Sequence, residues 1–116
     1  TVLINGKILN KPVNKKQSLK MLREISNQSH QVITGICIKT SKKETLFSVS
    51  SEVVFKNLSL DEMTYYIENF KPFDKAGSYG IQEWIGHIGV NKINGSYTNI
   101  MGLPTNDIYE NLKKNF

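Results

Sequence analysis

The residues best suited to chemistry lie in one stretch, Asp74 to Gln82, which reads DKAGSYGIQ. Asp74 offers oxygen ligands suited to Mg²⁺ or Mn²⁺, and Lys75 offers an ammonium suited to phosphate. Glycines let a backbone approach a ligand closely, and the amide of Gln82 can both donate to and accept from a nucleobase edge. Because short motifs often match by chance, composition alone favours a solvated turn that leads into a short helix.

Four other residues have side chains of types that could belong to such a site. Lys11 precedes Pro12, which fixes the backbone beside it, and is either a surface charge next to a turn or a phosphate ligand. His30 and His87 have no Cys or His neighbour at metal-ligand spacing, so neither is expected to be catalytic, and His30 is expected to be a hydrogen-bonded structural residue. Cys37 is expected to be a small buried residue of a strand.

Composition bounds the class of protein. The chain has 116 residues, 39% of them hydrophobic, which is typical of one soluble globular domain. No apolar run approaches the roughly 18 residues that a membrane span needs. The net charge of +5 favours an anionic partner, but the lysines are dispersed and there is one arginine, which argues against a nucleic-acid-binding module. A single cysteine fits a reducing, cytoplasmic setting.

Apolar periodicity predicts the elements that would position these residues. Strands are expected over 1–4, 30–38, 45–55 and 84–90, with a turn and short strand over 93–99. Helices are expected over 14–27, 59–70 and 105–115, the last with Ile108, Tyr109 and Leu112 facing inward. Asn5-Gly6 indicates a tight hairpin after the first strand, and Ser59 with Glu62 indicates a capping box.

A series of motifs follows the same course along the chain. They are Gly6-Lys7-Ile8-Leu9, Lys11-Pro12, Met21-Leu22, His30-x-Val32-x-Thr34-Gly35, Phe55-x-x-Leu58-Ser59, Tyr66, Pro72-x-Asp74-Lys75-Ala76-Gly77-x-Tyr79-Gly80-Ile81-Gln82, Ile93-x-Gly95-Ser96-Tyr97-x-Asn99 and Gly102-Leu103-Pro104. In this order and spacing they resemble the Maf, or septum-formation-inhibitor, family of nucleoside triphosphate pyrophosphatases. The resemblance covers the whole chain.

Family members also carry residues that this sequence does not contain. They open with a Ser-x-Ser-Pro-Arg-Arg loop and a lysine- and glutamate-bearing segment. They place an aspartate, thought to act as general base, immediately before the threonine that Thr1 resembles. We therefore expect residues 1–116 to form a single domain that corresponds to the C-terminal portion of a family member.

The resemblance implies metal-assisted hydrolysis of a nucleoside triphosphate to the monophosphate and pyrophosphate, with Mg²⁺ or Mn²⁺ as cofactor. It also implies a link to nucleotide-pool cleansing or cell-division arrest. Lys11 and Lys75 would bind phosphate, and Asp74 would either coordinate the metal or orient the water. Gly77 and Gly80 would bring the backbone close to the ligand.

Thr1 and Gln82 imply the substrate. Both match the subgroup that prefers dTTP and UTP, whereas an acidic residue replaces the glutamine in the subgroup acting on 7-methyl-GTP. An amide can pair with the O4 and N3–H of thymine or uracil. The alternatives are a 7-methyl-GTP pyrophosphatase and a non-catalytic fragment that binds nucleotide weakly.

The implied fold is α/β: a twisted mixed β-sheet with flanking helices, Maf/ITPase-like, with a nucleotide cleft between two lobes. Neither nucleic acid nor a membrane is expected as a partner. Family members are often dimers, which makes a homodimer an assembly to test for. Without the family's N-terminal part, the sheet is expected to have an exposed edge around 1–4.

Overall fold

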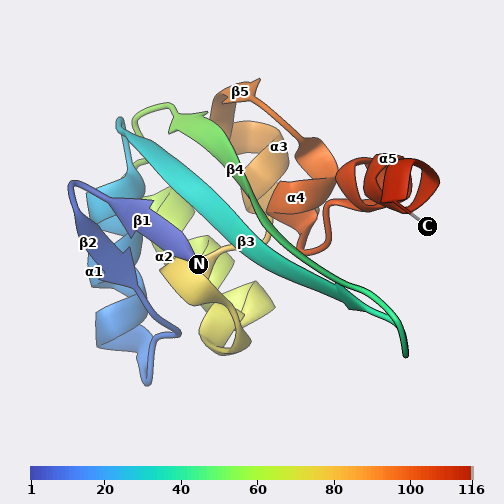
Figure 1. The fold of residues 1–116 in the computed structure, drawn as a ribbon. Coiled ribbons are helices and arrows are strands. Elements are labelled where there is room, and N and C mark those ends of the chain that lie inside the picture. The colour runs from blue at the N-terminus through green and yellow to red at the C-terminus, as the bar shows by residue number, and fades with distance from the viewer. Residues whose placement is uncertain (116) are drawn as a thin grey trace.

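A five-stranded antiparallel sheet, in the order β2-β1-β3-β4-β5, organises residues 1–115, which are the residues described by this computed structural model (Figure 1). Its strands are β1 (Val2–Ile4), β2 (Lys7–Leu9), β3 (Ser29–Lys39), β4 (Glu44–Phe55) and β5 (Val90–Asn94). The helices are α1 (Lys15–Ile25), α2 (Leu60–Phe70), α3 (Trp84–Gly89), α4 (Tyr97–Met101) and α5 (Thr105–Asn115), with single 3₁₀ turns η1 (Pro72–Asp74) and η2 (Ala76–Ser78). The predicted α/β fold with helices flanking a twisted sheet is confirmed. The expected mixture of parallel and antiparallel pairs is not found among these residues.

The first hairpin forms where the sequence predicts it. Asn5 and Gly6 both have positive φ, 51° and 75°, as a two-residue hairpin turn requires. β1 pairs with β2 on one side and with β3 on the other. The expectation of an exposed edge around residues 1–4 is therefore wrong, because the edge strands of the described sheet are β2 and β5.

The predicted hairpin of two long strands is confirmed. β3 and β4 pair in unbroken register from Ser29↔Val54 to Lys39↔Glu44, and their outer half runs beside α5, away from the core (Figure 1). Cys37 lies on this outer half, opposite Leu46, which is 72% exposed. The expectation of a buried Cys37 is wrong: among residues 1–115 no element covers that face of the ribbon, and the thiol is exposed.

Two helices begin at the caps that the sequence indicates. Asn14 Oδ1 accepts a hydrogen bond from Gln17 N at 2.9 Å, while the Gln17 side chain accepts from Val13 N. In α2 the full capping box is present, with Ser59 Oγ accepting from Glu62 N and Glu62 accepting from Ser59 N. Both caps satisfy backbone N–H groups that a helix start would otherwise leave unpaired.

The strand predicted over 84–90 is wrong, because residues 84–89 form α3. Glycines that suggested a bulged strand mark close packing instead. A Cβ on Gly86 would lie 1.9 Å from the carbonyl oxygen of Ile81, and one on Gly89 would lie 3.0 Å from the Phe55 ring. A strand pattern cannot be distinguished from a short buried helix when tertiary contacts of this kind set the glycine positions.

Two further expectations for the C-terminal third need correction. The turn and short strand expected over 93–99 is only partly found: residues 93 and 94 end β5, whereas residues 97–99 begin helix α4, which Ser96 caps by accepting from Asn99 N at 3.1 Å. The predicted helix at 105–115 is confirmed as α5, but Tyr109 and Leu112 are 62% and 40% exposed rather than facing inward. No helix among residues 1–115 is both long and apolar enough to cross a membrane.

The core lies between the sheet and the pair α1 and α2, which share one face of it (Figure 1). His30 is buried there, and its Nε2 lies 2.6 Å from the hydroxyl of Tyr79. The rings of His30, Phe55 and Tyr79 pack against one another with centroids 5.0 to 5.7 Å apart. The prediction of a hydrogen-bonded structural histidine is confirmed.

His30 is expected to make folding sensitive to mild acid. Burial lowers its pKa from 6.5 to about 4, so between these values the unfolded chain binds a proton that the folded chain does not. The free energy of unfolding should therefore fall by about 2 kcal/mol between pH 7 and pH 5 on account of this residue. Urea unfolding of the wild type and of His30→Gln at both pH values measures the difference. His87→Gln, at an exposed histidine, is the control. Equal pH dependence in wild type and His30→Gln would contradict the argument.

Candidate functional site

The 74–82 segment leaves α2 through two tight turns. Lys71 has φ 46° at the end of α2, and Pro72 opens η1. Gly77 adopts φ 72° inside η2, and its N–H donates to the carbonyl of Asn10 at 3.2 Å. That hydrogen bond holds the segment against the connection between β2 and α1, which carries Lys11.

A pocket of about 340 Å³ lies beside this segment. Its walls come from β1, β3, the residues after η1, and α4. Lining residues are Thr1, Val2, Val32, Thr34, Lys75, Ala76, Tyr79, Gly80, Ile81, Gln82, Asn99, Ile100, Met101 and Gly102. The fold therefore brings the predicted site residue Thr1, at the start of the sequence, together with Lys75, Gly80 and Gln82 of the 74–82 segment.

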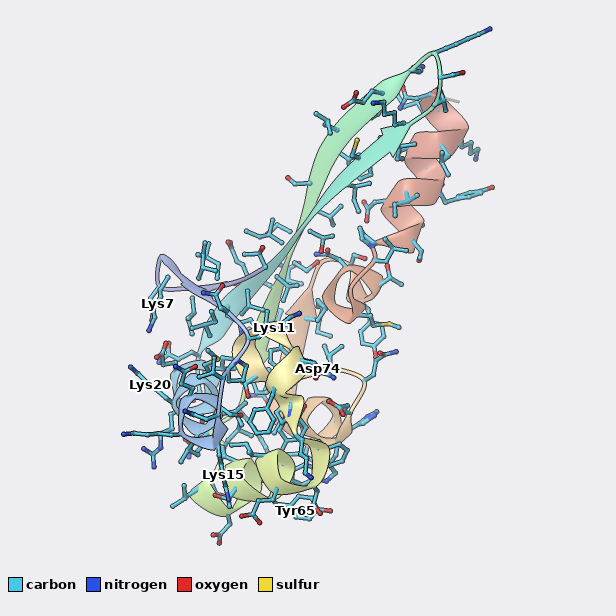
Figure 2. The ribbon with its side chains drawn as sticks, turned by 90° about the horizontal axis from the view of Figure 1, so that it is seen from below. Lys7, Lys11, Lys15, Lys20, Tyr65 and Asp74 are labelled. Carbon is cyan, nitrogen blue, oxygen red and sulfur yellow. The ribbon has the colours of Figure 1, made fainter. Side chains whose placement is uncertain are left out.

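Lys11, Asp74 and Gly77 do not line this pocket. Lys11 is exposed and lines a separate surface groove with Lys7 and Lys20. Figure 2 nevertheless shows Lys11 next to Asp74. The Lys75 ammonium and, to a smaller extent, Lys11 hold the pKa of the Asp74 carboxyl below its usual range. Lys75, which contacts Asp74 and also lines the pocket, connects the two groups of residues.

Lys75 lies between two carboxylates. Its Nζ is 3.2 Å from Oδ1 of Asp74 and 3.9 Å from Oε1 of Glu83. Its aliphatic stem lies over Gly80, where an added Cβ would be 2.7 Å from Lys75 Cε and 2.8 Å from Glu83 Oε1. A side chain at position 80 would therefore displace the ends of Lys75 and Glu83, a contact that the sequence does not reveal.

Contacts within the protein and the backbone conformation also favour glycine at position 77. A Cβ there would lie 3.1 Å from Cγ1 of Val2, and the positive φ disfavours any other residue. The expected close approach of Gly77 and Gly80 to a ligand stays a prediction, while their close approach to protein atoms is observed.

The donor set for a divalent metal is small. Among residues 1–115, no three His, Cys, Asp or Glu side chains come together as metal ligands would. The side chain of Asp74 is 76% exposed, and apart from Lys75 its carboxylate is open to solvent. Mg²⁺ is often held by one or two carboxylates together with substrate phosphates and water, and Asp74 fits that mode of binding.

Asn99 is the pocket residue to which sequence reasoning gave no role. It is fully buried, and its Nδ2 donates to the carbonyls of Val32 and Val49 and to Ser51 Oγ at 3.0 to 3.2 Å. Its Oδ1 is buried without a hydrogen-bond partner among the described residues. These bonds attach α4 to β3 and β4, and so position the pocket wall that Ile100 contributes. The sequence gives no signal for this role, because Asn99 follows the polar residues Ser96 and Thr98 and its partners lie far away along the chain.

Replacing Asn99 by alanine should detach α4 from the sheet. The change removes three hydrogen bonds and leaves buried acceptors unpaired, so the free energy of unfolding should fall by about 3 kcal/mol. Urea unfolding compares this variant with Asn57→Ala, where the asparagine is exposed in a loop. Equal stability of the two variants would show that the network contributes little.

Known proteins resemble this chain along most of its length. The model of the family described as Maf-like protein matches residues 1–115. The dTTP/UTP pyrophosphatase of Bacteroides thetaiotaomicron is 49% identical over 113 residues, which cover 97% of this chain and 58% of that protein. Proteins of the same name from Porphyromonas gingivalis and Flavobacterium johnsoniae are 49% and 52% identical, over 97% and 92% of this chain and 56% and 55% of their own lengths.

The chain thus spans about half the length of the curated relatives it matches. About half of the aligned positions are identical, over almost the whole of this chain. The chain belongs to the Maf-like protein family.

Proposed function

We propose that the protein to which this chain contributes hydrolyses dTTP and UTP at the α–β bond, releasing the monophosphate and pyrophosphate. The observation that carries the proposal is one pocket that contains both a cation for phosphate, Lys75, and an amide for a base edge, Gln82. The names of the relatives, all dTTP/UTP pyrophosphatases, support the same reaction.

Lys75 is the group best placed to bind the phosphates. Negative charge develops on phosphoryl oxygens as the anhydride bond breaks, and a fixed ammonium stabilises that charge. Lys11, beyond Asp74, would extend the cationic surface along the leaving pyrophosphate. Asp74 stays ionised because its pKa is lowered, so it can hold Mg²⁺ or Mn²⁺, which would polarise the phosphoryl oxygens when bound. The general base would come from the aspartate that family members place before Thr1.

Gln82 and Thr1 would select the base. They line the same pocket, and Gln82 is exposed and free to turn toward a ligand. A glutamine amide offers a donor to the O4 and an acceptor to the N3–H of thymine or uracil. This chemistry favours pyrimidines over 7-methyl-GTP.

Other expectations from the sequence stay proposals. We keep a cytoplasmic setting, since an oxidising compartment would leave the exposed Cys37 thiol open to intermolecular disulfides. We also propose a role in nucleotide-pool cleansing or cell-division arrest. A homodimer, and the absence of a nucleic-acid partner, are proposals as well.

The activity is tested by pyrophosphate release from dTTP, UTP, CTP and 7-methyl-GTP with Mg²⁺ or Mn²⁺. The 116-residue chain is compared with a version extended at its N-terminus by the corresponding segment of the Bacteroides thetaiotaomicron relative. Only the extended version should hydrolyse dTTP and UTP, and Lys75→Ala should lower its kcat/KM by about 100-fold. Lys92→Ala, at an exposed lysine of β5, is the control. A folded extended version without activity would refute the proposal.

The assignment of Gln82 is tested in the extended version by Gln82→Glu. A carboxylate cannot donate to O4 and repels the acceptor edge, so kcat/KM for dTTP should fall by about 100-fold. Gln31→Glu, an exposed glutamine on β3, adds the same charge away from the pocket and should have no effect. Preference of the unsubstituted protein for 7-methyl-GTP would show that the interpretation of Gln82 is wrong.

A further inference from the structure

Tyr66 is fully buried in α2, yet its hydroxyl makes two polar contacts with the segment that carries Lys75. It donates to Oε1 of Glu83 at 2.7 Å and accepts from the N–H of Gly80 at 3.0 Å. Burial raises the pKa of Tyr66, so the hydroxyl keeps its proton and remains a donor. One side chain thus fixes both ends of the turn from Gly80 to Glu83.

Glu83, held by Tyr66, in turn lies next to Lys75. Its carboxylate is 27% exposed and lies between the Tyr66 hydroxyl and the Lys75 ammonium, 3.9 Å from the latter. Lys75 is held on a second side by Asp74 and underneath by the bare backbone of Gly80. Lys75 lines the pocket, whereas Glu83 and Tyr66 do not, so any influence of these two residues on a ligand acts through Lys75.

A lysine side chain has many rotamers, and ordering it when phosphate binds costs conformational free energy. A lysine already held in place has lost that freedom before the ligand arrives. We propose that Glu83, anchored by Tyr66, is a positioning residue that keeps the Lys75 ammonium at the pocket wall for phosphoryl oxygens. This inference rests on the proposed function and adds to it a part of the phosphate-binding apparatus.

A merely electrostatic role for Glu83 makes the opposite prediction. If its carboxylate only adds negative charge near the pocket, Glu83→Gln should tighten the binding of an anion. If the carboxylate positions Lys75, the same change should weaken binding, because an amide still accepts from Tyr66 but no longer attracts the ammonium. The sign of the effect separates the two roles.

The experiment measures inorganic pyrophosphate binding by titration calorimetry, and kcat and KM for dTTP, on the N-terminally extended protein. Tyr66→Phe keeps the ring that stacks on Phe70, removes both hydrogen bonds and leaves the net charge unchanged. Tyr66→Phe and Glu83→Gln should each raise the Kd for pyrophosphate and the KM for dTTP about tenfold. Both effects should disappear in a Lys75→Ala background, which a general loss of structure would not produce.

Matched controls are Tyr65→Phe, at the exposed neighbour of Tyr66, and Glu52→Gln, at a half-buried carboxylate on β4. The inference is overturned if either test variant binds pyrophosphate as tightly as the unsubstituted protein, or more tightly. It is also overturned if the losses persist without Lys75. Failure of the proposed function looks different: the unsubstituted protein binds pyrophosphate but does not hydrolyse dTTP or UTP. An unsubstituted protein that does not bind pyrophosphate refutes both.

Discussion

The close packing of Gly77 against the first strand positions the candidate site residues of the 74–82 segment. The Gly77 N–H bonds to the Asn10 carbonyl at 3.2 Å, and the position of a Cβ there is taken by the Val2 side chain, 3.1 Å away. With the backbone fixed at this point, Lys75 emerges two residues before it and Gln82 five residues after it, both on the pocket wall. A side chain at Gly77 would strain the positive φ and press on Val2, and so would disturb the contact that brings these two residues near Thr1.

Buried polar groups hold the opposite walls of the pocket. On one side the Tyr66 hydroxyl ties α2 to the turn before α3, and on the other the Asn99 amide ties α4 to β3 and β4. A buried polar group that loses its partner costs free energy, because water cannot replace the hydrogen bond there. Positions of the turn or of α4 that would break these bonds are therefore disfavoured. Two walls of the pocket, the turn that begins at Gly80 and helix α4, are therefore oriented by directional hydrogen bonds as well as by apolar packing.

Local signals in the sequence predicted local structure well. The Asn5-Gly6 turn and the Ser59–Glu62 capping box depend on neighbouring residues, and both are present. The strand predicted over 84–90 is wrong because Gly86 packs against the carbonyl of Ile81, a tertiary contact on which sequence periodicity carries no information. In the candidate site, Lys75 and Gln82 could be proposed together because they are close in sequence, and both line the pocket. The contribution of Asn99 could not, since its partners lie about fifty to seventy residues away.

A phosphate ligand would compete with Asp74 for the Lys75 ammonium. Asp74 is largely exposed, and solvent screens its attraction for the ammonium, so such a pair is weak. A triphosphate offers more negative charge and more acceptors, and it would displace Asp74 at little cost. The Tyr66–Glu83 hydrogen bond involves a fully buried hydroxyl and need not break in that exchange. Lys75 would then exchange an exposed carboxylate for phosphate while its second contact remains, which leaves Asp74 free for a metal ion at the moment when the phosphates arrive.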